Sequence, residues 1–265
     1  MPDSTPSAEF SGQCIAVTGA ASGIGAALAR ELLEQGARVA ALDIQGEGLE
    51  VLRASCGTHA GNLRTIAVDV SQADAVEQAL SAAETALGPF DKLACVAGVL
   101  EMGNAVDLQD AQWAHCFAVN TTGVFNVCRY VARGMIARGA GAIVNVSSNA
   151  ATTPRAGMSA YAASKAAVSQ FTRCLALELA GHGIRVNLVS PGSTDTAMQR
   201  AMWALGSSRE AVIAGAPAQY RLGIPLNKIA TPEEIVQSIL FLLSDRASHI
   251  TLHDLRVDGG ATLDQ

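Results

Sequence analysis

The sequence predicts a single α/β domain, built on one doubly wound, seven-stranded parallel sheet with helices on both faces. Short apolar runs alternate with helical patterns along most of the chain, as expected for strands joined by crossover helices. The first apolar run meets a glycine-rich turn at 19–25, and a later helix carries Tyr161 and Lys165. Ligands of such sheets bind at the carboxyl ends of the strands, where these motifs lie.

Composition narrows the class of protein. The 265 residues are 49% hydrophobic and only 16% charged, which excludes ordinary disorder for most of the chain. The net charge of −6 argues against nucleic acid as a partner. Apolar residues are spread out, and none of their runs reaches the length that a membrane span needs, so no membrane is expected.

The start of the chain and the cysteines indicate a cytoplasmic protein. Residues 1–11 are polar, without a basic or apolar leader pattern, and we expect a loose tail before a domain at 12–265. The six cysteines show no C-x-x-C pairing and mostly lie in apolar runs. We interpret them as buried thiols in a reducing compartment, with neither a disulfide framework nor a metal site.

The first strand–turn–helix unit has the features of a nucleotide site. A strand at 13–18 meets the glycines of the 19–25 turn, a helix follows at 26–35, and a strand at 38–42 ends at Asp43. Glycines let the backbone approach a pyrophosphate, whose charge the helix N-terminus stabilises. Asp43 would accept hydrogen bonds from a ribose and repel a 2′-phosphate. Ser22, Ile44 and Gln45 supply no cation for that phosphate, so the pattern favours NAD over NADP.

The remaining elements continue the alternation. We expect strands at 63–68, 93–97, 142–148, 184–189 and 255–257, and helices at 73–87, 113–138 and 232–244, with another carrying Tyr161 and continuing to Ala180. The stretch 193–227 is less regular.

Tyr161 and Lys165 are the candidate acid/base pair. Four residues apart, they share one face of a helix. A nearby ammonium favours the phenolate and lowers the tyrosine pKa, which suits the removal of a hydroxyl proton near neutral pH. The spacing alone is weak, because chance supplies it on many helix faces.

Together these residues resemble the short-chain dehydrogenase/reductase family, over everything after the tail. The matching motifs are Thr18-Gly-Ala-Ala-Ser-Gly-Ile-Gly25, Asp69-Val70, Asn120, Ser148, Tyr161-x-x-x-Lys165, and Pro191-Gly192 with Thr196. The resemblance implies a Rossmann fold with Tyr161 as the general acid/base. It implies that Lys165 lowers the pKa of Tyr161, that Ser148 holds the reacting oxygen, and that Asn120 supports a proton path to Lys165.

The resemblance also implies an NAD site. Its expected residues are Gly19, Ser22, Gly23, Ile24, Gly25, Asp43, Ile44, Asp69, Val70, Ala97, Gly98, Tyr161, Lys165, Pro191, Gly192, Thr194 and Thr196. One motif departs from the family, which often has Asn-Asn-Ala-Gly where this chain has Cys95-Val-Ala-Gly98. The asparagine that usually braces this turn is absent.

A narrower group within the family fits four stretches, at 153–161, 189–200, 223–230 and 247–252. These resemble the 2,3-dihydro-2,3-dihydroxybenzoate dehydrogenases of catechol siderophore biosynthesis, in which a ring hydroxyl is oxidised and the product aromatises. The likeness implies a substrate lid around 193–227. Arg155 or Arg200 would bind the substrate carboxylate, and Met158 and Met198 would form apolar walls.

Three alternatives stay open from the sequence. They are a dehydrogenase of an amino analogue such as dihydro-3-hydroxyanthranilate, a generic 3-oxoacyl or ketone reductase, and a non-catalytic NAD-binding protein. The intact set of Asn120, Ser148, Tyr161 and Lys165 argues against the last. The resemblance also implies a homotetramer, formed through the helix that contains Asn120, the helix that contains Tyr161, and the last strand.

Overall fold

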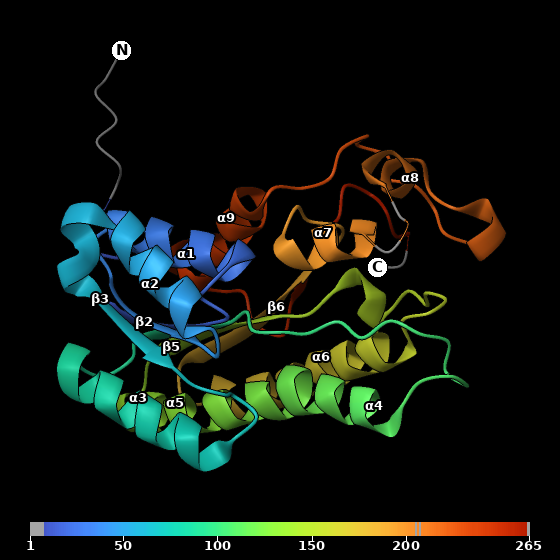
Figure 1. Ribbon diagram of the computed structural model, residues 1–265. Helices are drawn as coiled ribbons and strands as arrows, with labels where there is room; N and C mark the ends of the chain where they lie inside the picture. Colours follow the sequence, from blue (N-terminus) through green and yellow to red (C-terminus); the bar gives the residue numbers. More distant parts are fainter. Residues whose placement is uncertain (1–7, 205, 207, 264–265) are drawn as a thin grey trace.

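The computed structural model describes residues 8–204, 206 and 208–263. Its centre is the predicted parallel sheet, with strand order β3-β2-β1-β4-β5-β6-β7 (Figure 1). The strands are β1 Cys14–Thr18, β2 Arg38–Asp43, β3 Leu63–Ala67, β4 Lys92–Cys95, β5 Gly141–Val146, β6 Ile184–Pro191 and β7 Asp254–Val257. The chain winds outward in both directions from β1 and β4, so a crevice forms beyond their carboxyl ends.

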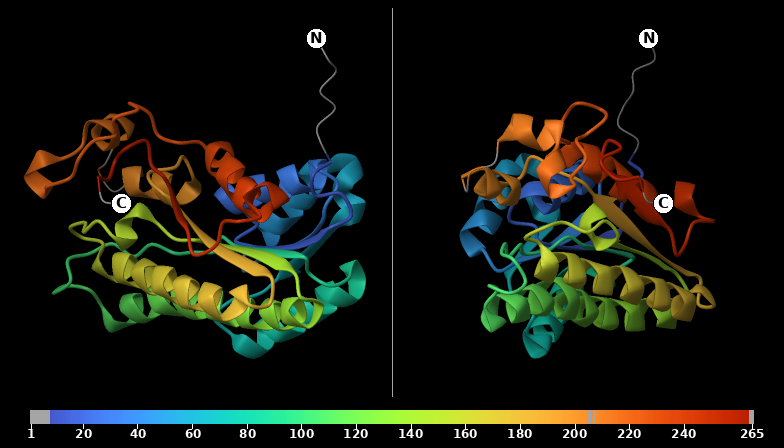
Figure 2. Two further views of the ribbon diagram at one scale, coloured as in Figure 1. Left: turned by 180° about the vertical axis from the view of Figure 1, so that it is seen from behind. Right: turned by 90° about the vertical axis from the view of Figure 1, so that its right-hand side faces the viewer.

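Two helical layers cover the sheet (Figure 1 and Figure 2). The layer of α1 Gly23–Glu34, α2 Gly46–Ser55 and α9 Pro232–Leu243 buries side chains such as Leu32 and Ile239. The opposite layer of α3 Ala73–Leu87, α5 Val124–Arg138 and α6 Ser159–Ala180 buries Leu80, Val127 and Val168. The predicted fold class is confirmed.

Two helices differ from the sequence prediction. α2 was not predicted, because this short segment begins with Gly-Glu-Gly and buries only Leu49 and Leu52. The long helix expected at 113–138 is divided into α4 Asp110–Phe117, a π-helical segment Ala118–Gly123, and α5. Hydrophobic periodicity does not reveal such a segment, because a single π-helical turn changes the backbone hydrogen bonds of only a few residues.

The stretch after β6 is more ordered than its sequence indicates. It contains α7 Ala197–Ala204, α8 Arg209–Ala214 and a 3-10 turn at Pro217–Gln219. Figure 1 shows α7 and α8 at the end of the molecule where α6 begins. This segment therefore overhangs the carboxyl ends of the central strands.

The amino-terminal boundary of the domain lies earlier than predicted. Residues 1–7 of the expected tail lie outside the described residues, but Phe10 is fully buried. The Lys92 ammonium lies 5.9 Å from the centre of the Phe10 ring, and Glu9 pairs with Arg246 at 3.0 Å. A loose tail reaching Ser11 is therefore wrong for residues 8–11, which Phe10 anchors by burying its ring.

All six cysteines are free thiols, and five are buried. No described helix is both long and apolar enough to cross a bilayer. The described side chains contain no cluster of His, Cys, Asp or Glu that could hold a metal ion.

Candidate active site

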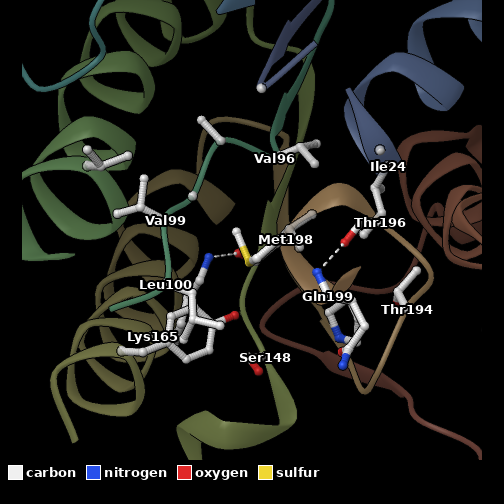
Figure 3. Close-up of a pocket in the computed structure, with 18 of the residues that line it drawn as sticks. Ile24, Val96, Val99, Leu100, Ser148, Lys165, Thr194, Thr196, Met198 and Gln199 are labelled. Atoms are coloured by element: carbon white, nitrogen blue, oxygen red, sulfur yellow. Dashed lines mark hydrogen bonds between the residues drawn. The ribbon is translucent and has the colours of Figure 1, made fainter. Parts of the chain in front are cut away.

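A cavity of about 340 Å³ lies at the carboxyl ends of the central strands (Figure 3). It gathers most of the residues that the sequence singles out, from segments as distant as the 19–25 turn and α7. Among the predicted residues, only Asn120 and Arg200 do not line it. The predicted residues that do are Gly19, Ser22, Gly23, Ile24, Gly25, Asp43, Ile44, Asp69, Val70, Ala97, Gly98, Ser148, Arg155, Met158, Tyr161, Lys165, Pro191, Gly192, Thr194, Thr196 and Met198.

The glycine-rich turn between β1 and α1 admits no side chains at two positions. Gly19 has φ of +71°, and a Cβ there would lie 2.6 Å from the Ala97 nitrogen. A Cβ on Gly25 would lie 2.0 Å from the Gly19 carbonyl oxygen. Bare backbone thus lines the cavity at the N-terminus of α1, as close approach of a pyrophosphate requires.

Asp43, at the end of β2, is held by two backbone amides. Ala21 N donates to Oδ2 at 3.0 Å and Gln45 N donates to Oδ1 at 2.9 Å. Each oxygen keeps a further lone pair for a ribose hydroxyl. The position and fixed orientation of the carboxylate fit the adenosine ribose of a dinucleotide.

The turn after β4, which departs from the family pattern, is braced from β1 instead. Thr18 Oγ1 accepts hydrogen bonds from Val96 N at 3.1 Å and Ala97 N at 3.2 Å. Thr18 is buried and lies beside Cys95 in the sheet. The hydroxyl fixes the Val96–Ala97 backbone in the absence of the usual asparagine.

Asn120 acts behind the cavity wall. It is fully buried in the π-helical segment, where its Oδ1 accepts from Val99 N at 2.8 Å. Its Nδ2 donates to Val99 O at 3.0 Å and to Ser164 Oγ at 2.9 Å, and Ser164 donates in turn to the Tyr161 carbonyl at 2.8 Å. Asn120 therefore joins the loop after β4 to the first turn of α6.

Ser148 and Tyr161 form a hydroxyl pair. Ser148 Oγ accepts from Ala150 N at 3.1 Å, which leaves its own proton for the Tyr161 oxygen, to which it is hydrogen-bonded. Desolvation raises the pKa of Tyr161 above its ordinary value of 10.0, while the Ser148 hydrogen bond acts in the opposite direction and lowers it.

Lys165 is buried on the next turn of α6. Its Nζ donates to the Val146 carbonyl at 2.9 Å and lies 6.0 Å from the centre of the Tyr161 ring. Burial lowers the pKa of Lys165 from 10.5 to about 8. Desolvation dominates the shift in the Tyr161 pKa and the Ser148 hydrogen bond opposes it, so the lowering of this pKa by Lys165 stays a prediction.

The predicted substrate residues divide between the cavity and the surface. Arg155, Met158 and Met198 line the cavity. Arg200 does not, because its side chain is 64% exposed and pairs with Asp195 at 2.7 Å. The carboxylate that holds the guanidinium, Asp195, does not line the cavity either.

Several polar residues that line the cavity were not predicted to be site residues, among them His115, Gln199 and Arg221. His115 Nδ1 lies 3.0 Å from Glu101 Oε1, and Figure 3 shows Gln199 next to Met198. No local sequence pattern marks these residues. They reach the cavity only through the placement of α4 and of the segment after β6.

Comparison with known proteins places the chain in a family. Residues 13–204 match the family described as short chain dehydrogenase. A 2,3-dihydro-2,3-dihydroxybenzoate dehydrogenase of Bacillus subtilis (strain 168) is 48% identical over 95% of this chain and 97% of its own. The protein of that name from Escherichia coli (strain K12) is 46% identical over 96% and 99%. D-threitol dehydrogenase of Mycolicibacterium smegmatis is 39% identical over 95% and 94%.

Solved structures show the same architecture. A short-chain type dehydrogenase/reductase from Mycobacterium marinum superposes with a TM-score of 0.88 at 32% identity, covering 97% of this chain and 98% of its own. Levodione reductase superposes with a TM-score of 0.87 at 29% identity, covering 95% and 98%. The glycine turn, the Ser148–Tyr161 pair and these matches agree, and the chain belongs to the short chain dehydrogenase family.

Proposed function

We propose that the protein oxidises a ring hydroxyl of 2,3-dihydro-2,3-dihydroxybenzoate to give 2,3-dihydroxybenzoate, with NAD as oxidant, in siderophore or related aryl-acid biosynthesis. The observation that carries the chemistry is the hydroxyl pair of Ser148 and Tyr161 in the same cavity that the glycine-rich turn lines. The choice of substrate is supported by the relatives of that name, which are 46–48% identical over nearly their whole length.

The reaction begins with removal of a proton from the substrate hydroxyl by Tyr161 as phenolate. Ser148 donates a hydrogen bond to the same oxygen and stabilises its developing charge. NAD, when bound, supplies a nicotinamide C4 that accepts the hydride from the carbinol carbon. Lys165 contributes positive charge beneath the tyrosine. The ketone product enolises to the aromatic catechol, which makes oxidation the favoured direction.

The preference for NAD rests on Asp43. Its carboxylate lines the cavity where the ribose of the adenosine would lie, and its charge would repel a 2′-phosphate. Neighbouring Ile44 supplies no cation. Comparable reduction of NAD and NADP by the purified protein would contradict this preference.

We further infer that the 193–227 segment forms the substrate lid. Met198 on α7 lines the cavity together with Met158, which precedes α6, so the two side chains supply apolar walls for a ring. Arg155, which the sequence predicts to be near the substrate carboxylate, lines the same cavity and adds positive charge to it. The lid interpretation is supported by the position of α7 over the strand ends (Figure 1).

Substrate choice is tested with a panel that follows NADH absorbance. We expect rapid turnover of 2,3-dihydro-2,3-dihydroxybenzoate and slower turnover of dihydro-3-hydroxyanthranilate. A hydroxyacyl thioester should give almost no NADH. Faster turnover of the amino analogue or of the thioester would replace the proposed substrate, and an absence of NADH with every compound would revive the non-catalytic alternative.

For assembly, we infer a homotetramer in the cytoplasm. Large apolar side chains are exposed on the outer helices, among them Trp113 (47%), Phe125 (40%) and Leu177 (68%). An interface between copies would remove this apolar area from water. The sulfurs of Cys95 and Cys128 lie 3.9 Å apart as free thiols, which fits a reducing compartment. Light scattering should give four times the mass of the chain.

A further inference from the structure

Gln199 carries a buried donor without a partner. The residue is 8% exposed, and its Nε2 has no hydrogen-bond partner among the described residues. Leaving such a donor unpaired is costly, so an unsatisfied amide in a cavity wall indicates a group that arrives with a ligand. Gln199 lines the cavity from the first turn of α7, where its backbone nitrogen donates to Thr196 Oγ1 at 3.3 Å.

Arg221 lines the same cavity from the other end of the lid segment. Its side chain is half-buried, and Nη2 donates only a long hydrogen bond, 3.4 Å, to the Val212 carbonyl. No carboxylate of the described residues forms an ion pair with it. Burial lowers the pKa of Arg221 below its ordinary value, and no opposing acidic group contributes to that shift. An arginine guanidinium is not deprotonated in proteins, so Arg221 is charged and most of its five donors are available.

The backbone around Arg221 is firmly held. Arg221 N donates to Ala216 O at 3.1 Å, and Ala216 N donates to Arg221 O at 2.9 Å. Gly215 and Gly223 pack so closely that a Cβ on Gly215 would lie 2.5 Å from the Gly223 nitrogen. A partly buried cation on a fixed turn is arranged for a ligand, unlike Arg200, which pairs with Asp195 on the surface.

Charge is divided along the cavity. The acidic lining residues are Asp43 and Asp69, which follow β2 and β3 on the nucleotide side. The arginines are Arg155 and Arg221, which belong to the loop after β5 and to the lid segment. An anionic group of the substrate is thus attracted to the lid end of the cavity and repelled from the other.

We propose that Gln199 and Arg221 together bind the carboxylate of the substrate, an inference that rests on the proposed function. The Gln199 amide donates a hydrogen bond to one carboxylate oxygen, and the Arg221 guanidinium supplies charge and further donors. Both residues lie on the 193–227 segment, near its two ends. A carboxylate that binds both of them therefore links these two parts of the lid above the substrate ring. These residues select for an acid without touching the reacting hydroxyl.

The test measures binding, so it does not depend on turnover. Titration calorimetry compares 2,3-dihydroxybenzoate with catechol, which lacks the carboxylate, on the NADH-loaded enzyme. The ratio of their dissociation constants gives the carboxylate preference. We expect Gln199→Leu and Arg221→Gln each to reduce this preference on the order of 10- to 100-fold. Gln199→Glu should reduce it further through repulsion, and all three should leave NADH affinity unchanged.

Two controls separate this role from a structural one. Arg209→Gln, at an exposed position on α8 that does not line the cavity, should keep the wild-type preference. Gln199→Leu should unfold at the same temperature as wild type or higher, because it removes an unsatisfied donor; a marked fall would indicate a structural role and overturn the assignment.

Other outcomes are also decisive. Equal preference in wild type and variants, a wild type that does not prefer the acid, or weakened NADH binding by Gln199→Leu would each overturn the inference. So would loss of the preference in Arg155→Gln alone. A wild type that prefers the acid through Gln199 and Arg221, yet does not oxidise the dihydrodiol acid, would instead refute the proposed function.

Discussion

The two halves of the cavity are built in different ways. The nucleotide half is formed by the 19–25 turn and the ends of β2 and β3. Its surface is mostly backbone, and glycines without side chains line the cavity there. The reaction half is formed by Ser148, Tyr161, Lys165 and the 193–227 segment, and side chains line the cavity there. Changes in the first half should therefore act on NAD binding and stability, and changes in the second on turnover and substrate choice.

The largest effect is expected from Tyr161→Phe, which tests whether the reaction half can be disabled alone. Removal of the acid/base group should lower kcat about 10²–10⁴-fold or more. The NAD dissociation constant should change little, since the nucleotide half is intact. Stopped-flow turnover and NADH fluorescence titration measure the two quantities. Near-normal kcat would refute the assignment of Tyr161.

Ser148→Ala should have the next largest effect. Loss of a preorganised donor to the reacting oxygen should lower kcat on the order of 10²–10³-fold. Oxidation needs the phenolate, so kcat rises as pH rises through the Tyr161 pKa. The Ser148 hydrogen bond lowers that pKa, so its loss should move the rising limb to higher pH. If kcat of Ser148→Ala rose over the same pH range as kcat of the wild type, Ser148 would not lower the pKa of Tyr161.

The two halves also differ in how far the sequence predicts them. Gly19, Gly25 and Asp43 follow from local spacing, because strand, turn and helix are consecutive and their geometry is set by near neighbours. Ser148, Tyr161 and Lys165 were predicted because they occur in the same order as the motifs of the short-chain dehydrogenase/reductase family. Gln199 and Arg221 were missed because only the folding of the lid segment brings them to the cavity.

Local sequence patterns also do not report pKa shifts or the bounds of the domain and its helices. The pKa of Tyr161 depends on the desolvation of its phenol by surrounding protein, and a four-residue spacing cannot report that. Phe10 lies in a polar stretch that indicates a tail, yet its ring is buried. The alternation of apolar runs with helical patterns predicted the parallel sheet and most helices, whereas it gave no sign of the π-helical segment around Asn120.

In the nucleotide half, Gly25→Ala should weaken binding by displacing backbone. The new Cβ would lie 2.0 Å from the Gly19 carbonyl oxygen, so the turn must shift. We expect a loss of about 1–3 kcal/mol in the free energy of unfolding and a similar loss in NAD binding. Gly61→Ala is the matched control, since a Cβ there meets nothing within 4 Å. Equal denaturation midpoints for the two variants would contradict the backbone-built interpretation.

Asp43→Asn should alter coenzyme choice with a smaller effect. The amide oxygen can still accept one of the two backbone hydrogen bonds from Ala21 N and Gln45 N, but the negative charge is gone. The preference for NAD over NADP should fall by about tenfold, because the repulsion of the 2′-phosphate disappears. Ratios of kcat/KM for the two coenzymes measure this. An unchanged ratio would mean that another group sets the preference.

Arg200→Gln should have the smallest effect, and it marks the outer limit of the reaction half. The sequence placed Arg200 near the carboxylate, but its guanidinium is exposed and already bound to Asp195 at 2.7 Å. Exposed ion pairs contribute little, so kcat/KM for the dihydrodiol acid should change less than about twofold. Arg221→Gln, in contrast, should raise KM on the order of tenfold or more, with little change in kcat. If Arg200→Gln raised KM as much as Arg221→Gln does, the lid would have to close further on the substrate and bring Arg200 inside. The reaction half would then be completed only when the ligand binds, whereas the glycine-built nucleotide half is already formed.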